Sequence, residues 1–224
     1  KKISKLKIML NTIFPKIHKE GYKFLAISII ITFFCLLFSK VLGLILILIT
    51  VWVYYFFRDP DRYPINNDAF LVSPADGLIT DISERTGPVE LQLENVTFNK
   101  ISIFMNVFNC HVNRTPVSGV VEEIYYKPGK FLNASLDKAS EENERNYYKI
   151  KCNKTGEEII IVQIAGLIAR RIVCEVEQGQ NLKQGERIGM IRFGSRVDIY
   201  FKNKKVLAKL GQNVVAGESL ISSE

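Results

Sequence analysis

Two uncharged apolar runs near the N-terminus place the strongest limit on how this chain can fold. The first covers residues 24–38 and the second residues 41–57, with Ser39 and Lys40 between them. A helix that spans a bilayer needs about 20 apolar residues, and about 17 is near the lower limit. A water-soluble helix pair with so little charge would expose a large apolar surface. The runs therefore predict a helical hairpin that spans the membrane or enters one leaflet.

Basic residues are concentrated ahead of these runs. The net charge is +7, and residues 1–23 contain seven lysines against one acidic residue, Glu20. From Arg58 onward, 22 basic residues balance 22 acidic ones. A lysine-rich segment beside an apolar run is typical of an anionic membrane surface rather than of a nucleic-acid site. With Arg58 and Arg62 on the other flank, the charges predict that both ends of the hairpin face the cytoplasm.

The remaining residues, 58–224, predict a mainly β (α+β) domain. One helix is predicted over residues 132–146, and residues 1–57 form a separate basic arm and membrane-anchoring helical hairpin. Short alternating or apolar segments bounded by turn residues predict the strands. These are residues 69–73, 77–83, 100–108, 119–126, 147–152, 158–165, 170–176 and 187–201.

An internal repeat indicates the architecture of the C-terminal half. The sequence GQNLKQGERI at residues 179–188 returns as GQNVVAGESL at residues 211–220. Each copy predicts a turn, a short apolar hook and a second glycine that leads into a strand. Two such units predict a pseudo-symmetric barrel or sandwich, similar to biotinyl and lipoyl carrier domains. Those domains present a lysine at a hairpin tip, whereas here Gly194 and Ser195 lie between the copies.

Few side chains outside the N-terminal arm suit catalysis. The four cysteines show no metal-binding spacing, and the chain has only two histidines, so no metal site is predicted. His111 is the only histidine after residue 57. Asp76 lies in a turn-like Pro-Ala-Asp-Gly sequence, where an aspartate commonly stabilises the turn. Ser195 shares the apolar face of residues 197–201, either as a strand-start serine bonded to backbone or as a reactive group.

Six sequence motifs occur in one order and carry a resemblance. They are FFRDPDR (56–62), SPADG (73–77), FNCHVNRTPVSG (108–119), GKFLNAS (129–135), NER (143–145) and FGS (193–195). Together they resemble the phosphatidylserine decarboxylase family, in particular its short bacterial and archaeal-type branch. The resemblance implies a proenzyme that cuts itself between Gly194 and Ser195. The products would be chains 1–194 and 195–224, with Ser195 converted to a covalent pyruvoyl group and no metal or pyridoxal phosphate.

The resemblance also implies a role for each candidate residue. Asp76 would orient His111, which would deprotonate the Ser195 hydroxyl during self-cleavage and later protonate the decarboxylated substrate. Larger members of the family have a second histidine where this chain has Arg114. For a lipid substrate of this kind, the candidate contacts to its phosphodiester and carboxylate are arginines: Arg58, Arg62, Arg114, Arg170 and Arg171.

The expected reaction is decarboxylation of phosphatidylserine to phosphatidylethanolamine and carbon dioxide at the cytoplasmic face of the membrane. The partners would be the phospholipid and the membrane, with no nucleic acid, and a homo-oligomer is compatible with the sequence. An archaetidylserine decarboxylase is the nearest alternative. A membrane-anchored, carrier-like β module without catalysis is the alternative from another class.

Removing residues 1–57 tests the division into anchor and catalytic domain. The shortened protein should remain in the supernatant when membranes are sedimented, yet still cleave itself, because every proposed catalytic residue lies beyond Arg58. Equal partitioning of the shortened and full-length chains to membranes would contradict the assignment of the anchor.

Overall fold

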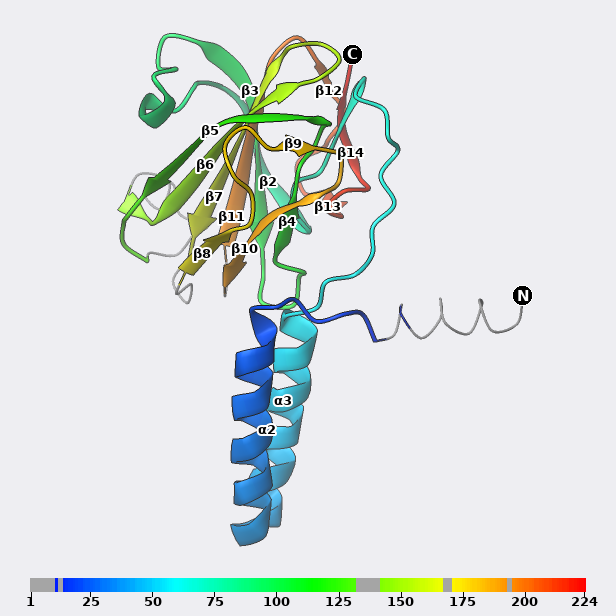
Figure 1. Ribbon diagram of the computed structural model, residues 1–224, viewed down its shortest axis with the longest axis vertical. Helices are drawn as coiled ribbons and strands as arrows, with labels where there is room; N and C mark the ends of the chain where they lie inside the picture. The colour runs from blue at the N-terminus through cyan, green and yellow to red at the C-terminus, as the bar shows by residue number, and fades with distance from the viewer. Residues whose placement is uncertain (1–10, 12–13, 132–141, 167–170, 193–194) are drawn as a thin grey trace, which may run out of the picture. The chain divides into compact units, whose positions relative to one another are not determined.

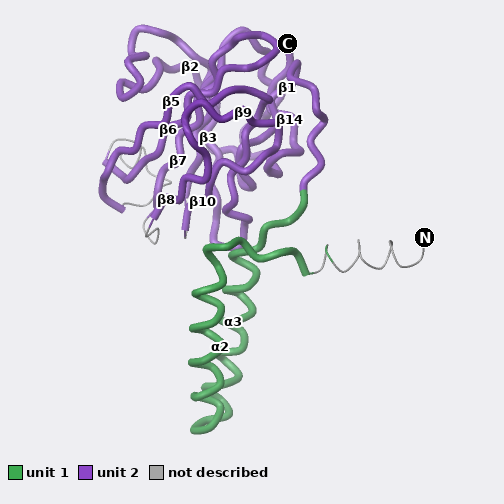
Figure 2. The backbone as a smooth tube through the Cα atoms, in the orientation of Figure 1, with its two compact units in different colours: residues 1–61 green, residues 62–224 purple. Residues whose placement is uncertain are grey.

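The computed structural model describes residues 11, 14–131, 142–166, 171–192 and 195–224 (Figure 1). The chain divides into two compact units, Lys1–Asp61 and Arg62–Glu224 (Figure 2). The first unit contains the predicted helical hairpin, and the second is rich in strands. The assignment of anchoring to residues 1–57 and catalysis to residues 58–224 stays a prediction.

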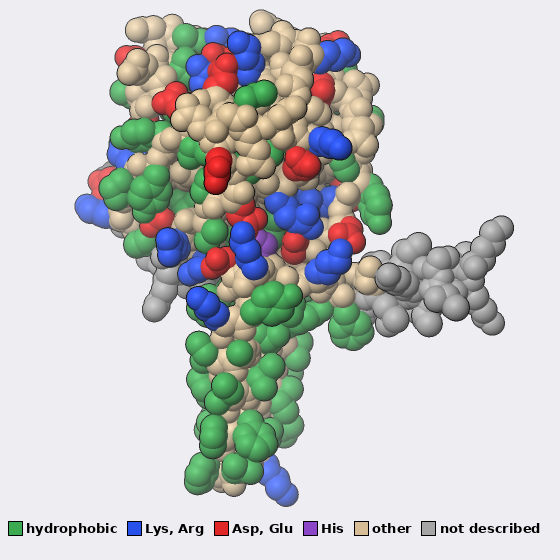
Figure 3. Space-filling model, viewed as in Figure 1, with side chains coloured by type: hydrophobic (Ala, Val, Ile, Leu, Met, Phe, Trp, Pro, Cys, Tyr) green, Lys and Arg blue, Asp and Glu red, His purple; other side chains and the backbone are tan. Residues whose placement is uncertain are grey.

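The hairpin consists of α2 (Gly21–Phe38) and α3 (Lys40–Phe56). Ser39 separates them and caps α3, because its Oγ accepts a hydrogen bond from the Leu42 amide at 3.4 Å. The helices contact through the hydroxyl groups of Thr32 and Thr50, 2.9 Å apart. Most other side chains on both helices are apolar and point outward (Figure 3). By length and composition α2 is apolar enough to cross a membrane, and α3 is one residue shorter, so the hairpin fits membrane association.

The second unit is built on a curled, fully antiparallel sheet (Figure 1). Its eight strands lie in the order β13 (Asn213–Val214), β2 (Gly77–Thr86), β3 (Thr97–Met105), β11 (Ser195–Phe201), β7 (Glu158–Ala165), β6 (Arg145–Cys152), β5 (Gly119–Lys127) and β9 (Asn181–Leu182). Two three-stranded sheets complete the unit. One contains β1 (Phe70–Val72), β14 (Leu220–Ser223) and β12 (Lys205–Val206); the other contains β4 (Val112–Arg114), β10 (Arg187–Arg192) and β8 (Arg171–Cys174).

The apolar residues of the three sheets form one main core. Inward-facing residues of β11 such as Val197 and Ile199 are fully buried there, together with Leu71 of β1 and Ile221 of β14. A smaller cluster on the other face of the large sheet lies under the short 3-10 helix η1 (Val89–Leu91). Both faces of the central strands are therefore covered, which explains why β7 reads as an almost continuous apolar run.

The repeat recognised in the sequence appears as matching backbone structure. The paired glycines Gly179 and Gly185 of one copy, and Gly211 and Gly217 of the other, all have φ between +76° and +85°. Glycine adopts this left-handed backbone without the steric cost that other residues meet. After its first glycine each copy forms a two-residue strand, β9 against β5 and β13 against β2. The predicted pseudo-symmetric, mainly β architecture is confirmed.

The symmetry extends to a second pair of segments that the sequence analysis did not match. Ser73 and Thr115 each begin a Ser/Thr-Pro turn, and each hydroxyl donates to a backbone carbonyl two residues later at 2.7 Å. Strands β2 and β5 then start at Gly77 and Gly119. In both strands the pairing register shifts two residues after this glycine, at Ile79 in β2 and at Val121 in β5. The large sheet is thus two related halves that meet where β11 pairs with β7.

Each of the eight segments expected to be extended contains a strand. The structure differs from the predicted elements at three places. Residues 187–201 form two strands, β10 and β11, and residues 193–194 between them lie outside the described residues. Residues 106–108 leave β3 in a turn, because the Asn106 and Asn109 side chains bond to the backbone of that turn. The prediction of a helix over residues 132–146 is wrong at its end, because Arg145 and Asn146 belong to strand β6 and pair with β7. Residues 132–141 lie outside the described residues.

Gly119 offers a test of this packing. A Cβ atom there would collide with the Lys151 carbonyl oxygen on β6. Gly119→Ala should therefore lower the free energy of unfolding by about 1–3 kcal/mol or more, as overpacked sites do. Gly156→Ala is the control. A Cβ atom at this position meets open space, and the residue has a φ of +70°. The substitution should lower the free energy of unfolding only by the left-handed backbone penalty of about 1 kcal/mol. Denaturant unfolding of the self-cleavage-blocked Ser195→Ala chain measures both, and equal losses would contradict the close approach of β5 and β6.

Candidate active site

Ser195 is the first residue of β11, at the centre of the large sheet. It pairs with Met105, the last residue of β3, and with Ala165, the last residue of β7. Its side chain is fully buried on the apolar face, as the alternation predicts. The hydroxyl oxygen lies 3.8 Å from Met105 Sδ, and a thioether is a weak hydrogen-bond acceptor. Gly194, the other residue of the expected cleavage site, lies outside the described residues.

His111 lies in the connection between β3 and β4 and is fully buried. Its Nδ1 is 3.0 Å from the Asn109 carbonyl oxygen. Since a carbonyl oxygen only accepts, Nδ1 must carry the hydrogen, which makes Nε2 the basic nitrogen of the neutral ring. The Asn109 side chain in turn accepts from the Asn106 amide at 2.8 Å. The turn therefore fixes both the tautomer and the position of the imidazole.

Asp76 makes its contacts with Arg62 and the backbone of residue 216. Its Oδ2 lies 2.7 Å from an Arg62 terminal nitrogen, and its Oδ1 accepts from the Ala216 amide at 2.7 Å. In the other half of the sheet, Ser118 occupies the related position and accepts from the Gln184 amide at 3.2 Å. Among the described residues no hydrogen bond joins Asp76 to His111. The contacts present connect Asp76 to the second glycine hook.

A buried polar chain leads from the serine into the sheet. The Asn113 amide nitrogen lies 3.6 Å from the same Met105 sulfur, and Asn113 Oδ1 accepts from Gln163 at 2.8 Å. The Tyr148 hydroxyl lies 2.8 Å from Gln163 Oε1 and 3.1 Å from the Ile188 carbonyl oxygen. Burial raises the pKa of Tyr148 well above its ordinary value, so the hydroxyl keeps its hydrogen.

Sequence reasoning missed this chain of polar residues. The one available signal was Gln163, a polar side chain inside the apolar run of residues 159–165. A buried amide needs hydrogen-bond partners, but the sequence does not show that those partners lie on β4 and β6.

The candidate substrate arginines lie in different places. Arg114 is buried and donates to the Gly185 carbonyl oxygen at 2.9 Å. It lines a pocket of about 420 Å³ with Arg62, Lys183 and Arg187. Arg171 begins β8 and is exposed, paired in register with Arg192. Arg170 lies outside the described residues.

The candidate residues lack a metal-binding cluster. No group of three or more His, Cys, Asp or Glu side chains could hold a metal ion in the part of the chain that the structure describes. The site offers a buried serine beside a thioether and a buried imidazole of defined tautomer.

Comparison with known proteins places this chain in an enzyme family. The family model for phosphatidylserine decarboxylase matches residues 49–222. The chain is 65% identical over 216 residues to a phosphatidylserine decarboxylase proenzyme of Pelagibacter ubique, covering 96% of this chain and 100% of that protein. Proteins of the same description from Rickettsia akari and Ruegeria pomeroyi are 49% and 48% identical, over 95% and 96% of this chain and 92% and 98% of theirs. The chain belongs to the phosphatidylserine decarboxylase family, as its motifs indicated.

The Arg62–Asp76 pair generates a prediction about Asp76. Both side chains are nearly buried, and removing one partner leaves a poorly solvated charge that costs about 1–3 kcal/mol or more. If Asp76 acts by fixing the hook at Ala216, Arg62→Gln and Asp76→Asn should both slow self-cleavage. Arg85→Gln, at an exposed position, should not. The measurement is the rate of appearance of the small chain after synthesis. Normal cleavage in Arg62→Gln would instead favour a role for Asp76 through His111 alone.

Proposed function

We propose that this chain is a self-cleaving phosphatidylserine decarboxylase whose pyruvoyl group derives from Ser195. The observation that supports it best is the burial of Ser195 as the first residue of the central strand. The relatives are described as proenzymes, which agrees with a cut that yields chains 1–194 and 195–224. They are also described as acting on phosphatidylserine, which favours it over archaetidylserine. Membership of an enzyme family counts against the carrier-like module without catalysis.

The surroundings of Ser195 fit a pyruvoyl group. The serine side chain lies on the face occupied by Val197 and Ile199, beside a thioether and against the main apolar core. Conversion removes the nitrogen and the hydroxyl oxygen and leaves a methyl ketone. A methyl group is better accommodated here than a hydroxyl with one weak acceptor. When present, the ketone acts as an electron sink. It takes up the electron pair that remains when carbon dioxide leaves the amine substrate.

The maturation reaction can be written from the residues of the chain. His111 Nε2 takes the Ser195 hydroxyl proton, and the oxygen attacks the Gly194 carbonyl carbon. The amide bond breaks and an ester forms. Loss of the Ser195 α-proton then breaks the Cβ–O bond, which leaves a Gly194 carboxylate and dehydroalanine at residue 195. Water replaces the nitrogen of that residue, which departs as ammonia.

His111 has a second role in the proposal. After carbon dioxide leaves, a proton must be delivered to the substrate α-carbon, and the protonated Nε2 is the candidate donor. The hydrogen bond from Nδ1 to the Asn109 carbonyl oxygen holds the ring. Nε2 therefore keeps one orientation in the self-cleavage step and in the protonation step. Asp76 supports the site through its hydrogen bond to the Ala216 amide and by orienting His111. Arg114, Arg170 and Arg171 remain proposed contacts for substrate anions.

The hairpin explains why the substrate is a lipid. An apolar anchor with basic flanks keeps the catalytic domain at the surface where the head groups lie. We place that domain on the cytoplasmic face of the membrane, with the phospholipid as its partner.

Substitution of Ser195 and of His111 tests the proposed self-cleavage. Ser195→Ala should leave a full-length, inactive chain, and Ser195→Cys or Ser195→Thr should cleave slowly because each keeps a nucleophile. His111→Ala should reduce cleavage by about 10²–10⁴-fold, the usual contribution of a general base. His18→Ala, at the only other histidine, should cleave normally. Denaturing electrophoresis follows the reaction, and a normal small chain from Ser195→Ala would contradict the proposal.

A further inference from the structure

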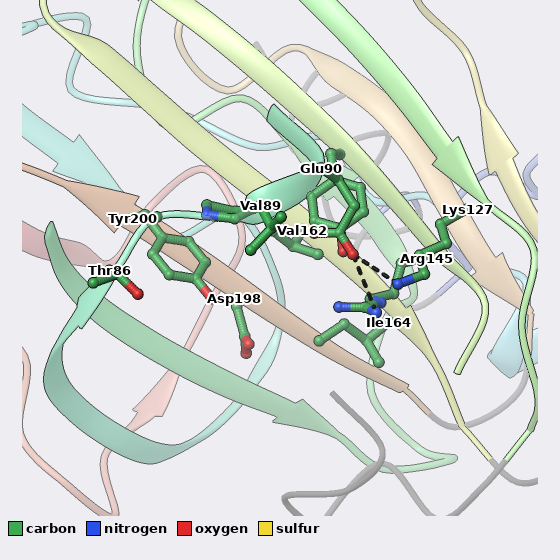
Figure 4. Close-up of a pocket in the computed structure, with 12 residues that line it drawn as sticks. Thr86, Val89, Glu90, Lys127, Arg145, Val162, Ile164, Asp198 and Tyr200 are labelled. Carbon is green, nitrogen blue, oxygen red and sulfur yellow. Dashed lines mark hydrogen bonds and ion pairs between the residues drawn. The ribbon is translucent and has the colours of Figure 1, made fainter. Parts of the chain in front are cut away.

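The NER motif at residues 143–145 carries part of the family resemblance but takes no part in the steps of the proposed self-cleavage. Asn143 is fully buried, and Glu144 and Arg145 are nearly so. Arg145 points into a pocket of about 490 Å³, where its side chain lies 3.4 Å from Glu90 Oε1 (Figure 4). Asn143 and Glu144 make different contacts, with two strands that flank the proposed cut.

Asn143 completes a backbone pairing that β6 leaves open. In an antiparallel pair, two opposed residues exchange both backbone hydrogen bonds. Glu144 and Ala165 lie opposite each other just beyond the β6–β7 pairing, and the Ala165 amide donates to the Glu144 carbonyl oxygen at 3.0 Å. The Glu144 amide instead donates to the Lys130 carbonyl oxygen at 3.0 Å. The Asn143 side-chain amide takes its place and donates to the fully buried Ala165 carbonyl oxygen at 2.6 Å.

The Glu144 side chain holds a second strand. β8 is an edge strand of its sheet, and the amide of its residue Ile172 donates to Glu144 Oε1 at 2.9 Å. A hydrogen bond to a carboxylate is stronger than one between neutral groups. Glu144 thus contacts β7 through its backbone and β8 through its carboxylate.

These two strands flank the proposed cut on opposite sides. Ala165 of β7 pairs in register with Ser195, the first residue after the cut. Ile172 of β8 pairs with Ile191, near the end of β10, the strand that precedes the cut. β10 and β11 belong to different sheets, so pairing with each other does not set their relative position. The motif joins the neighbour of one strand to the neighbour of the other.

We propose that Asn143 and Glu144 are positioning residues for self-cleavage. The inference rests on the proposed function, since it concerns the attack of Ser195 on the Gly194 carbonyl. Asn143 holds the end of the strand beside Ser195, and Glu144 holds the strand beside β10. A displacement of 1 Å at a reacting centre can cost about 10²-fold in rate, so both contacts favour the attack without touching the reacting atoms.

The cut should separate the two contacts in their effects. Before cleavage both β10 and β11 must be held, because the hydroxyl attacks across the junction between them. After cleavage the chain that follows β10 ends in a carboxylate, and only β11 still carries the reacting group. Loss of the Glu144 contact should therefore slow cleavage alone, whereas loss of the Asn143 contact should slow both cleavage and turnover.

Glu144→Leu removes the acceptor for the Ile172 amide. Self-cleavage should slow by about 10- to 100-fold, while kcat per small chain for phosphatidylserine in mixed micelles stays within about twofold of the wild-type value. Glu144→Gln keeps an oxygen that accepts from the same amide, so its cleavage rate should lie within about fivefold of wild type. Denaturing electrophoresis measures cleavage. A glutamine variant as slow as the leucine variant would contradict positioning through this hydrogen bond.

Asn143→Leu removes the donor to Ala165 and keeps a side chain of similar size. The cleavage rate and kcat per small chain should both fall by at least about tenfold, because residue 195 lies beside Ala165 in both reactions. Asn143→Asp keeps the shape, also lacks the amide donor and replaces the leucine variant if that chain does not fold. A normal kcat in the cleaved Asn143 variants would contradict the role assigned to Asn143.

Asp68 supplies a matched control. Its carboxylate also accepts from a backbone amide, that of Ser118 at 2.8 Å, but at the start of β5, whose strand partners are β6 and β9. Asp68→Leu should cleave and turn over at the wild-type rates. Denaturant unfolding in the cleavage-blocked Ser195→Ala background measures the stability that each substitution removes. Equal slowing of cleavage in Asp68→Leu and Glu144→Leu, or a parallel fall of cleavage and kcat in Glu144→Leu, would overturn the inference.

The same measurements separate this inference from the proposed function. A wild-type chain that neither cleaves nor decarboxylates would contradict the proposed function and, with it, the positioning roles. A wild-type chain that does both, with Glu144→Leu cleaving at the wild-type rate, would contradict the positioning roles alone.

Discussion

The hydrogen bonding of β11 on both of its edges is the constraint on which the site depends. Seven residues of this strand pair with β3, and six pair with β7. This pairing fixes Ser195 in register with the ends of both neighbours and directs its side chain to the apolar interior. In the proposed self-cleavage Ser195 attacks its own preceding carbonyl, and a rigid position favours that attack because proximity and orientation supply much of the rate. After the proposed cut before Ser195, the strand would remain anchored through the pairing of its other residues.

The two related halves of the sheet carry the other candidate residues, Asp76 and His111, next to their Ser/Thr-Pro turns. Each half contributes a Ser/Thr-Pro turn, a strand that begins at glycine and a glycine hook. The halves differ where chemistry is expected. Position 76 carries a carboxylate paired with Arg62, whereas the related position carries Ser118, and His111 precedes only the second turn. A symmetric frame with asymmetric side chains is consistent with a duplicated fold in which one set of positions acquired catalytic use.

Much of the fold could be predicted from the sequence because its signals are local. The apolar runs indicated α2 and α3, the alternation of residues 197–201 placed Ser195 on the buried face, and the glycine repeats indicated the hooks. The end of the helix over residues 132–146 was predicted wrongly, because the polar sequence around Arg145 suits a helix until its pairing with β7 is known. Tertiary pairing overrides local preference in such segments.

The parts of the site that escaped prediction depend on contacts between distant segments. The bonds among Asn113, Gln163 and Tyr148 join three strands. The partner of Asp76 was also missed, because Arg62 reads in the sequence as a flank of the membrane segment. Family resemblance named Ser195, His111 and Asp76, but it did not show the hydrogen bonds that hold His111 and Asp76.

The central claim is that Ser195 becomes a pyruvoyl group at the start of this buried strand. The intact mass of the small chain from the wild-type protein tests it most directly. We expect a chain of residues 195–224 that is lighter than the simple hydrolysis fragment by one molecule of ammonia, with its N-terminus blocked to amine-specific labelling. A small chain with the mass of an ordinary N-terminal serine, or a chain that remains full length, would contradict the conversion of Ser195.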